Sequence, residues 1–340
     1  MESANVQSPY PLLQIATGFW ASRALYAAAR FGIADLLADG PVSVEELARA
    51  SGAHPGSLKR VLRALASLGV FAEDEGGLIH QSPQSLPLRS SQVGSLRQFV
   101  LMLGEPESWR AWGDVMHSVT TGTSAFEHVF GATLFDYMAA HPEAAQTFEA
   151  AMVERGAAED EAIVAAWDFG ETGRIVDVGG GRGTLLAAVL HSRPGRCGAL
   201  FDLAHVVKRA RSMFEAQGLA SRWQGIAGNV FTDPLPAAAE TYVLKKVIHD
   251  WEDTQAIEIL KACGRVMTLR SRLLVMEPVI AAGNEPSFAK LLDLFMLVWP
   301  GGRERTLEEH AGIIASAGLE LRRTVATQSA LSILEVVRRA

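Results

Sequence analysis

The sequence has little cysteine and no long apolar run. Cys197 and Cys263 are its only cysteines, so a disulfide framework is excluded and the composition fits a reducing cytosol. It has no C-x-x-C motif or cysteine–histidine cluster of the kind that binds metal ions. No stretch approaches the roughly 18 apolar residues that a membrane span requires. Gln14, Ser22 and Arg23 interrupt the apolar residues near the N-terminus, which argues against a signal peptide. We therefore expect a cytoplasmic protein with no membrane partner and no bound metal.

Basic residues are in the minority. The chain has 31 lysines and arginines against 38 aspartates and glutamates, which gives a formal net charge of −7. This balance argues against nucleic acid as the main partner, because phosphate backbones attract an excess of positive charge. Hydrophobic residues make up 49% of the chain, which is enough for a large core, and a length of 340 residues predicts two domains or one with an appendage.

The stretch 174–186 predicts the first strand–turn–helix unit of a nucleotide-binding α/β sheet. Residues 175–178 include three β-branched apolar residues, which indicate a buried strand. Four glycines follow within 179–183, and apolar residues then recur at helical spacing over 185–190. Glycines let the backbone turn tightly and approach a ligand closely, while the helix N-terminus offers free N–H groups.

The glycine spacing distinguishes between two nucleotide cofactors. The dinucleotide turn reads G-x-G-x-x-G, whereas here Gly179, Gly181 and Gly183 alternate and Thr184 stands where the third glycine belongs. The next apolar run ends in Asp202, the right place and residue type to bind a ribose diol. The combination resembles S-adenosylmethionine-dependent methyltransferases, with NAD binding as the rival interpretation.

The first hundred residues predict a helical domain. Residues 1–9 are polar and expected to be disordered, and residues 11–37 carry apolar positions at helical spacing that Gly32 could divide into two helices. Ser43 and Glu46 form a capping-box pattern at the start of a short helix that Gly52 ends.

A second helix over 55–68 and a hairpin over 70–79 complete a winged-helix-like layout, which is common in DNA-binding proteins. The tip of the wing, 73–75, is acidic and would be repelled by phosphates. Protein contact is therefore favoured over a ligand-sensing transcription regulator. A break in the pattern at 104–106 predicts two domains, residues 1–104 and 105–340.

Past Asp202 the strand–helix alternation continues, and His249 directly follows the fourth strand of the predicted sheet. Strands are expected near 222–227, 242–248 and 273–279, helices near 205–217 and 254–266, and a closing antiparallel hairpin over 319–326 and 331–337. Ligands of open α/β sheets lie outside the carboxyl ends of the strands, so this position favours a functional histidine.

Spaced motifs over nearly the whole length resemble the small-molecule O-methyltransferase family of plants and bacteria, whose members methylate flavonoids, caffeate-type phenols and polyketide antibiotics. The motifs are DVGGGRG at 177–183, FDL at 201–203, GNVF at 228–231, LKKVIHDW at 244–251, EP at 277–278 and GGRERT at 301–306. The resemblance implies a Rossmann-like class I methyltransferase sheet with a closing hairpin, and a winged-helix-like dimerisation domain that forms an intertwined homodimer. It also implies S-adenosylmethionine as methyl donor and S-adenosylhomocysteine as product.

The resemblance assigns His249 as the general base, flanked by Glu277 and Glu304. The chemistry agrees, because a phenol with a pKa near ~10 is a poor nucleophile at neutral pH, while an imidazole with a pKa near ~6.5 can accept its proton. From the residues alone, Glu304 would be surface charge between two arginines; the family match gives it a role.

The resemblance also implies binding residues. The cofactor residues are Gly179 and Gly181 near the methionine part, Asp202 on the ribose, Gly228, Asn229 and Val230 around the adenine, and Lys245 nearby. Asn229 departs from the aspartate that is usual in the family. The implied substrate residues are Phe148, Met152, Phe295, Met296 and Trp299, each of which could instead be core. Apolar, aromatic walls suit a flat phenolic or heteroaromatic substrate.

Three alternatives remain open. The chain could methylate nitrogen or carbon, or it could belong to a diverged branch with hydroxylase or decarboxylase chemistry. The third is the transcription regulator described above.

Overall fold

A computed structural model describes residues 10–92 and 94–339 as two compact units, so the polar N-terminal residues 1–9 lie outside the described chain. The first unit comprises Met1–Trp109 and Glu143–Arg155, and the second comprises Arg110–Pro142 and Gly156–Ala340. The predicted boundary after residue 104 lies near the end of the first segment, whereas the return of 143–155 to the first unit has no counterpart in the prediction. The domain limits stay a prediction.

The first unit has the predicted order of helices and hairpin. Its elements are α1 (Tyr10–Arg30), α2 (Ile33–Leu36), β1 (Val42–Ser43), α3 (Val44–Ser51), α4 (Pro55–Ser67), β2 (Phe71–Glu73), β3 (Leu78–Gln81), η1 (Leu86–Leu88), α5 (Arg97–Gly104), the start of α6 (Pro106–Gly113) and the part of α10 (Pro142–Ala166) over 143–155. Gly32 separates α1 from α2 with a φ of 67°, Ser43 and Glu46 form the expected capping box, and Gly52 ends α3. Strand β3 pairs with both β1 and β2, all antiparallel.

The second unit is built on one mixed sheet. Its elements are α7 (Val115–Thr121), α8 (Ala125–Phe130), α9 (Leu134–Ala140), the last part of α10 (Pro142–Ala166), β4 (Gly173–Val178), α11 (Thr184–Ser192), β5 (Arg196–Asp202), α12 (Ala204–Ala216), β6 (Trp223–Ala227), β7 (Thr241–Lys245), η2 (Ile248–Asp250), α13 (Asp253–Val266), β8 (Arg272–Ile280), α14 (Phe288–Val298), β9 (Arg305–Thr306), α15 (Leu307–Ser316), β10 (Leu319–Ala326) and β11 (Leu331–Arg338). The strand order is β10-β11-β8-β7-β4-β5-β6. Strands β4 to β8 pair in parallel, and β10 and β11 form the predicted antiparallel hairpin at one edge. The predicted α/β architecture is confirmed.

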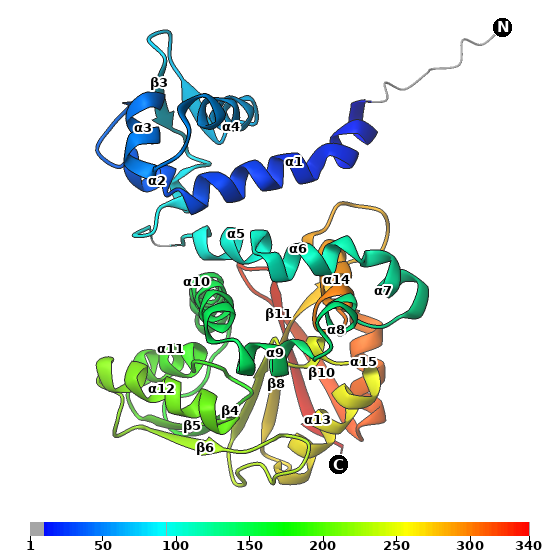
Figure 1. Ribbon diagram of the computed structural model, residues 1–340. Coiled ribbons are helices and arrows are strands. Elements are labelled where there is room, and N and C mark those ends of the chain that lie inside the picture. The colour runs from blue at the N-terminus through cyan, green and yellow to red at the C-terminus, as the bar shows by residue number, and fades with distance from the viewer. Residues whose placement is uncertain (1–9, 93, 340) are drawn as a thin grey trace, which may run out of the picture. The chain divides into compact units, whose positions relative to one another are not determined.

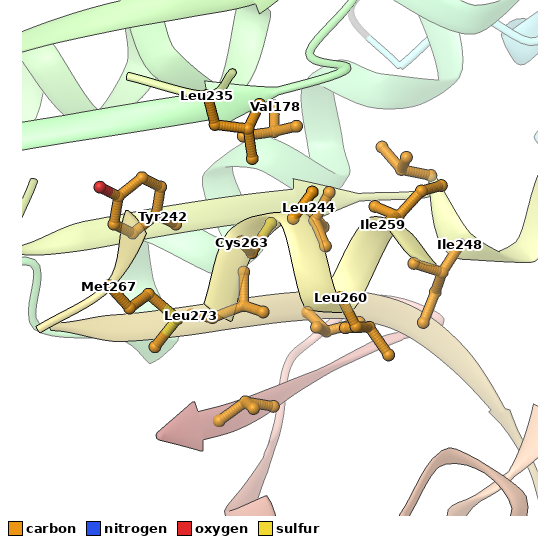
Figure 2. Packing of buried hydrophobic residues seen from close by; sticks show 14 of the residues in the cluster. Val178, Leu235, Tyr242, Leu244, Ile248, Ile259, Leu260, Cys263, Met267 and Leu273 are labelled. Carbon is orange, nitrogen blue, oxygen red and sulfur yellow. The ribbon is translucent and has the colours of Figure 1, made fainter. Parts of the chain in front are cut away.

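Helices cover both faces of this sheet (Figure 1). Along β4, Ile175 packs with α11 and α12 on one face, while Val176 and Val178 pack on the other, as the alternation of strand side chains requires. On that second face, α13 inserts Ile259, Leu260 and Cys263 toward β7 and β8 (Figure 2). Each fully buried Leu or Ile contributes on the order of 1.5–3 kcal/mol. Within the described part of the chain, no helix combines the length and apolarity needed to cross a bilayer.

The fourth strand ends earlier than predicted, and the reason is local. The prediction near 242–248 is wrong at its end, because β7 stops at Lys245. Lys246 adopts a left-handed φ of 52°, and the N–H groups of Val247 and Ile248 donate to the Glu277 carboxylate instead of to a neighbouring strand. This turn starts η2 and carries His249 to the carboxyl edge of the sheet.

Candidate active site

The glycine turn after β4 needs its glycines. Gly179, Gly181 and Gly183 all have positive φ values, of 68°, 59° and 75°, which L side chains rarely adopt. A Cβ atom on Gly180 would overlap the carboxyl group of Asp177. The Gly179 N–H donates to the carbonyl of Phe201 over 2.8 Å, which fixes the turn against the end of β5. The result is a backbone cradle at the N-terminus of α11.

Asp202 closes this cradle from β5. Its Oδ2 accepts from the Gly181 N–H at 2.9 Å, and its Oδ1 accepts from the Leu203 N–H at 2.7 Å. Burial raises the pKa of the Asp202 carboxyl, and these two backbone hydrogen bonds oppose the rise. The structure therefore brings the predicted ribose residue directly onto the glycine turn.

Asp177 is a residue of this cradle that the sequence analysis did not assign. It is 1% exposed, and neither of its carboxylate oxygens accepts a hydrogen bond from the described residues. Burial and the nearby charge of Asp160 raise its pKa to about 7. In the sequence, an acidic residue within an otherwise apolar strand could have indicated a site residue here. A cationic group of a ligand above the glycine turn would satisfy this carboxylate.

Lys245 lies at the end of β7 and points toward α10. Its Nζ donates to Asp160 Oδ1 at 2.5 Å and to the Gly156 carbonyl at 3.3 Å, and it lies 3.5 Å from Glu159 Oε2. Lys246 Nζ also lies 2.9 Å from Glu159 Oε2. Lys245, predicted as a cofactor residue, is therefore held in a buried ion-pair cluster that ties the second-unit part of α10 to the sheet.

The segment after β6 forms a tight turn. The Asn229 side-chain oxygen accepts from the Phe231 N–H at 3.0 Å, and the Asn229 N–H donates to Asp233 at 2.8 Å. Gly228 lies against the Phe201 ring, where a Cβ atom would approach the ring to 2.6 Å. Val230 packs against the core of the sheet. The Asn229 oxygen retains a second lone pair for a ligand amino group.

Phe231 of this turn belongs to a chain of aromatic rings that were not predicted as site residues. The Phe231 and Trp251 rings meet edge to face at 4.8 Å, and the Phe135 ring lies 6.3 Å from Trp251 in a stacked arrangement. Phe231 and Trp251 lie in the GNVF and LKKVIHDW motifs, so the sequence contained the information needed to propose them as site residues. Such rings suit a planar base.

The second constellation centres on His249, which is 8% exposed. Its Nδ1 lies 2.8 Å from Glu304 Oε1 and 3.6 Å from Glu277 Oε2, and its Nε2 lies 3.5 Å from Asp250 Oδ1. A carboxylate can only accept, so Nδ1 donates to Glu304. Both glutamates are buried, and each keeps one oxygen that no described residue hydrogen-bonds. The structure thus brings the three predicted catalytic residues together.

Three carboxylates determine the charge of this imidazole. Burial by itself lowers the pKa of His249, but the charges of Glu277, Asp250 and Glu304 outweigh burial and raise it to about 9. Burial raises the pKa of Glu277 to about 7 and that of Asp250 to about 6, although the His249 charge opposes both. The site therefore stabilises a protonated histidine, which is the form that a general base reaches after it has taken a proton.

The loop that carries Glu304 is clamped onto the His249 turn. The Arg303 N–H donates to the His249 carbonyl at 2.8 Å, and the buried Arg305 guanidinium donates to the carbonyls of Ile248 and Trp251 at 3.0 and 2.8 Å. A Cβ atom on Gly302 would overlap the His249 carbonyl. Three hydrogen bonds from Arg303 and Arg305, together with the close approach of Gly302, thus set the distance between Glu304 and the imidazole.

The predicted substrate residues divide between the units. Phe295, Met296 and Trp299 lie on or directly after α14, with the Trp299 ring 5.0 Å from Phe295 and 5.7 Å from Phe126. Phe148 and Met152 are half-buried residues of α10 within the first unit. Asp293, also on α14, accepts from the Glu304 N–H at 2.8 Å, so the helix with the aromatic residues also holds the loop that carries Glu304.

Known proteins resemble the chain over almost its whole length. Residues 112–320 match an O-methyltransferase domain and residues 13–85 match an O-methyltransferase dimerisation domain. Over 324 residues, 95% of this chain and 94% of its relative, the chain is 44% identical to a phenazine O-methyltransferase from Lysobacter antibioticus. It is 32% identical to a phenazine-1-carboxylate N-methyltransferase from Pseudomonas aeruginosa over 96% of each protein. A neocarzinostatin O-methyltransferase, solved with S-adenosylmethionine and 2-hydroxy-5-methyl naphthoic acid, has a TM-score of 0.83 at 32% identity, covering 99% of this chain and 100% of that one.

Proposed function

The chain belongs to the S-adenosylmethionine-dependent O-methyltransferase family and has its class I methyltransferase fold, and from this premise we propose that it methylates a hydroxyl of a small aromatic substrate with His249 as the general base. The observation that supports this best is the His249–Glu304 hydrogen bond at the carboxyl edge of the sheet. It fixes the proton on Nδ1 and leaves Nε2 to take the substrate proton.

S-adenosylmethionine supplies, when bound, an electrophilic methyl group on a sulfonium sulfur. His249 Nε2 removes the hydroxyl proton as the oxygen becomes the nucleophile, which overcomes the weak nucleophilicity of a neutral phenol. Glu304 and Glu277 stabilise the imidazolium that results, and their burial strengthens this interaction. The remaining work of the chain is to position the two reactants and to exclude water.

The residues around the glycine turn fit this cofactor. Gly179 and Gly181 would hold its methionine part and Asp202 its ribose hydroxyls, while Gly228, Asn229 and Val230 would hold the adenine. Two features support the assignment. The buried Asp177 carboxylate lacks a hydrogen-bond partner among the described residues. Phe231, whose N–H donates to the Asn229 side chain, also places its ring against that of Trp251. Lys245 would act indirectly, by holding α10 against the end of β7.

The substrate class follows from the relatives and from α14. The phenazine and naphthoic acid compounds that the relatives' names mention are flat and aromatic. Phe295, Met296 and Trp299 offer the apolar contacts that such a ring system needs. We propose a phenolic or heteroaromatic secondary metabolite; contributions of Phe148 and Met152 stay predictions.

Dimer formation through the first unit is also part of the proposal. Large apolar side chains of α1 are exposed, among them Leu12 at 71%, Ile15 at 79% and Trp20 at 64%. Burying them against a second copy removes this surface from water, and the match to a dimerisation domain points the same way. A monomeric mass for the full chain in sedimentation at micromolar concentration would contradict it.

With its two free cysteines, the protein is proposed to act in the cytoplasm.

Transfer of labelled methyl groups to a library of hydroxylated phenazines and naphthoic acids tests the function. The His249→Ala variant is expected to bind S-adenosylmethionine normally and to lose at least about 100-fold in turnover. His191→Ala, at an exposed position of α11, is the matched control and should keep full activity. Near-normal turnover in His249→Ala would refute the general-base role.

N-methylation is the second candidate, favoured by the similarity to the Pseudomonas aeruginosa enzyme. A ring nitrogen with a free lone pair needs no base. A library containing unsubstituted phenazines separates the two, because only N-methylation would label them and only O-methylation would depend on His249.

A further inference from the structure

A second cluster of potential ligands lies outside the catalytic site. Asp114, His117 and His128 each offer one ligand atom, and these atoms lie within 4.8 Å of one another. His128 Nδ1 lies 2.7 Å from Asp114 Oδ2, and the two imidazole rings stack with centroids 3.9 Å apart and planes 6° apart. His117 Nε2 also lies 3.0 Å from the Thr123 hydroxyl. No step of the proposed methyl transfer uses these three side chains.

The backbone that presents the Asp114–His117–His128 cluster is firmly held. Asp114 precedes α7 and its carbonyl accepts from the His117 N–H at 2.9 Å, which places both side chains on one turn. The turn between α7 and α8 is closed by the buried Ser118 hydroxyl, which accepts from the Ala125 N–H at 2.9 Å. Ser124 caps α8 and donates to the Trp299 carbonyl at 2.6 Å. The cluster can therefore form without folding a new loop.

We propose that Asp114, His117 and His128 form a binding site for a divalent transition-metal ion of the Zn²⁺ class. Two imidazoles and one carboxylate are ligands that Zn²⁺ takes in three-ligand sites, with a water at the fourth position. Bonds of about 2.0–2.1 Å require the ligand atoms to lie roughly 3.3 Å apart. The side chains must therefore rotate from their present separations, which include 2.7 Å between His128 Nδ1 and Asp114 Oδ2. A ring nitrogen binds a metal in the ring plane, and the stack is therefore given up on binding.

Exposure separates this cluster from the catalytic one. His249, Glu277 and Glu304 form the other group of possible metal ligands among the described residues, and all three are buried. The His128 side chain is 57% exposed and that of Asp114 is 36% exposed, so both can turn and an ion can reach them from solvent. The bound ion would join the start of α7 to α8. The pair of helices α7 and α8 also holds the end of α14, because Ser124 between them donates to the Trp299 carbonyl.

Zinc titration of the metal-stripped, tag-free full chain tests the site by calorimetry at pH 7.5, where free imidazole is largely neutral. We expect one ion per chain, a thermal midpoint that zinc raises, and a tetrahedral absorption spectrum with Co²⁺. Affinity for Zn²⁺ should fall at least tenfold in each of His117→Gln, His128→Gln and Asp114→Asn. These surface variants should melt like the parent chain without metal.

Cys197→Ser and His141→Gln are matched controls, since each removes an exposed zinc ligand away from the cluster and should leave the titration unchanged. The proposal is overturned if His128→Gln binds zinc like the parent chain. It is equally overturned if binding is lost in His249→Gln or Cys197→Ser, or if the parent chain shows no binding at millimolar zinc. None of these readouts depends on methyl transfer, so the site and the proposed function can fail separately.

Discussion

Replacing Glu304 by Gln should move the pH dependence of methyl transfer. Glu304 supplies both a charge and the hydrogen bond acceptor for His249 Nδ1, 2.8 Å away. Glutamine keeps an acceptor oxygen at nearly the same place but removes the charge. The substitution therefore separates orientation of the ring from stabilisation of its protonated form.

The magnitude follows from the His249 pKa of about 9. Relative to an ordinary histidine near ~6.5, the carboxylates stabilise the imidazolium by about 3 kcal/mol after the opposing effect of burial. At pH 7 only about 1% of the imidazole is then neutral and able to accept a proton. We expect kcat/KM of the parent enzyme to rise about tenfold per pH unit from pH 7 and to level off near 9. In Glu304→Gln the inflection should shift to lower pH, while the plateau falls by about 100-fold because the imidazolium formed in the reaction loses its partner.

The assay measures labelled methyl transfer between pH 6 and 10, with a substrate whose hydroxyl has a pKa near ~10 so that its ionisation does not obscure the inflection. Glu308→Gln provides the same chemical change at an exposed position of α15 and should reproduce the parent profile. An unchanged inflection in Glu304→Gln, or a parent rate that is flat between pH 7 and 9, would refute the proposed electrostatics.

Two further predictions concern stability. The folded-state pKa of Asp177, about 7, exceeds the usual 3.8, so the folded protein binds the extra proton and stability falls as pH rises through this range. Asp177→Asn should therefore raise the free energy of unfolding above pH 7, by on the order of 2–4 kcal/mol in urea denaturation, while weakening S-adenosylmethionine binding in calorimetry. A less stable variant with normal cofactor affinity would contradict both parts. Gly302→Ala should lower the free energy of unfolding by about 2 kcal/mol or more, because its Cβ overlaps the His249 carbonyl. Gly312→Ala, where a Cβ meets nothing within 4 Å in α15, should instead stabilise slightly; equal effects at the two glycines would disprove the packing argument.

Local patterns were sufficient for much of the fold. The capping box of Ser43 and Glu46, the break at Gly32 and the hairpin strands 319–326 and 331–337 depend on neighbours in the sequence, and the structure has them where the patterns indicate. The end of β7 does not depend on neighbours alone. It is decided by Glu277 on the neighbouring strand β8, because its carboxylate accepts hydrogen bonds from the N–H groups of Val247 and Ile248.

The same distinction explains what could be predicted of the site. Gly179, Asp202 and His249 lie at or just beyond the carboxyl ends of β4, β5 and β7, which are neighbours in the sheet, so their residue types and the α/β alternation were enough to place them at one edge of the sheet. Glu304 belongs to no such strand end.

From the sequence, Glu304 is an acid between two arginines, and only the fold shows that Arg305 is buried against the carbonyls of Ile248 and Trp251. The arginine that made Glu304 look like surface charge is therefore what anchors it beside His249. A buried guanidinium needs acceptors, and the turn that carries His249 supplies them. Since Asp253 completes the pairing at 2.9 Å, the positive charge is compensated without drawing on Glu304, whose carboxylate stays directed at the imidazole.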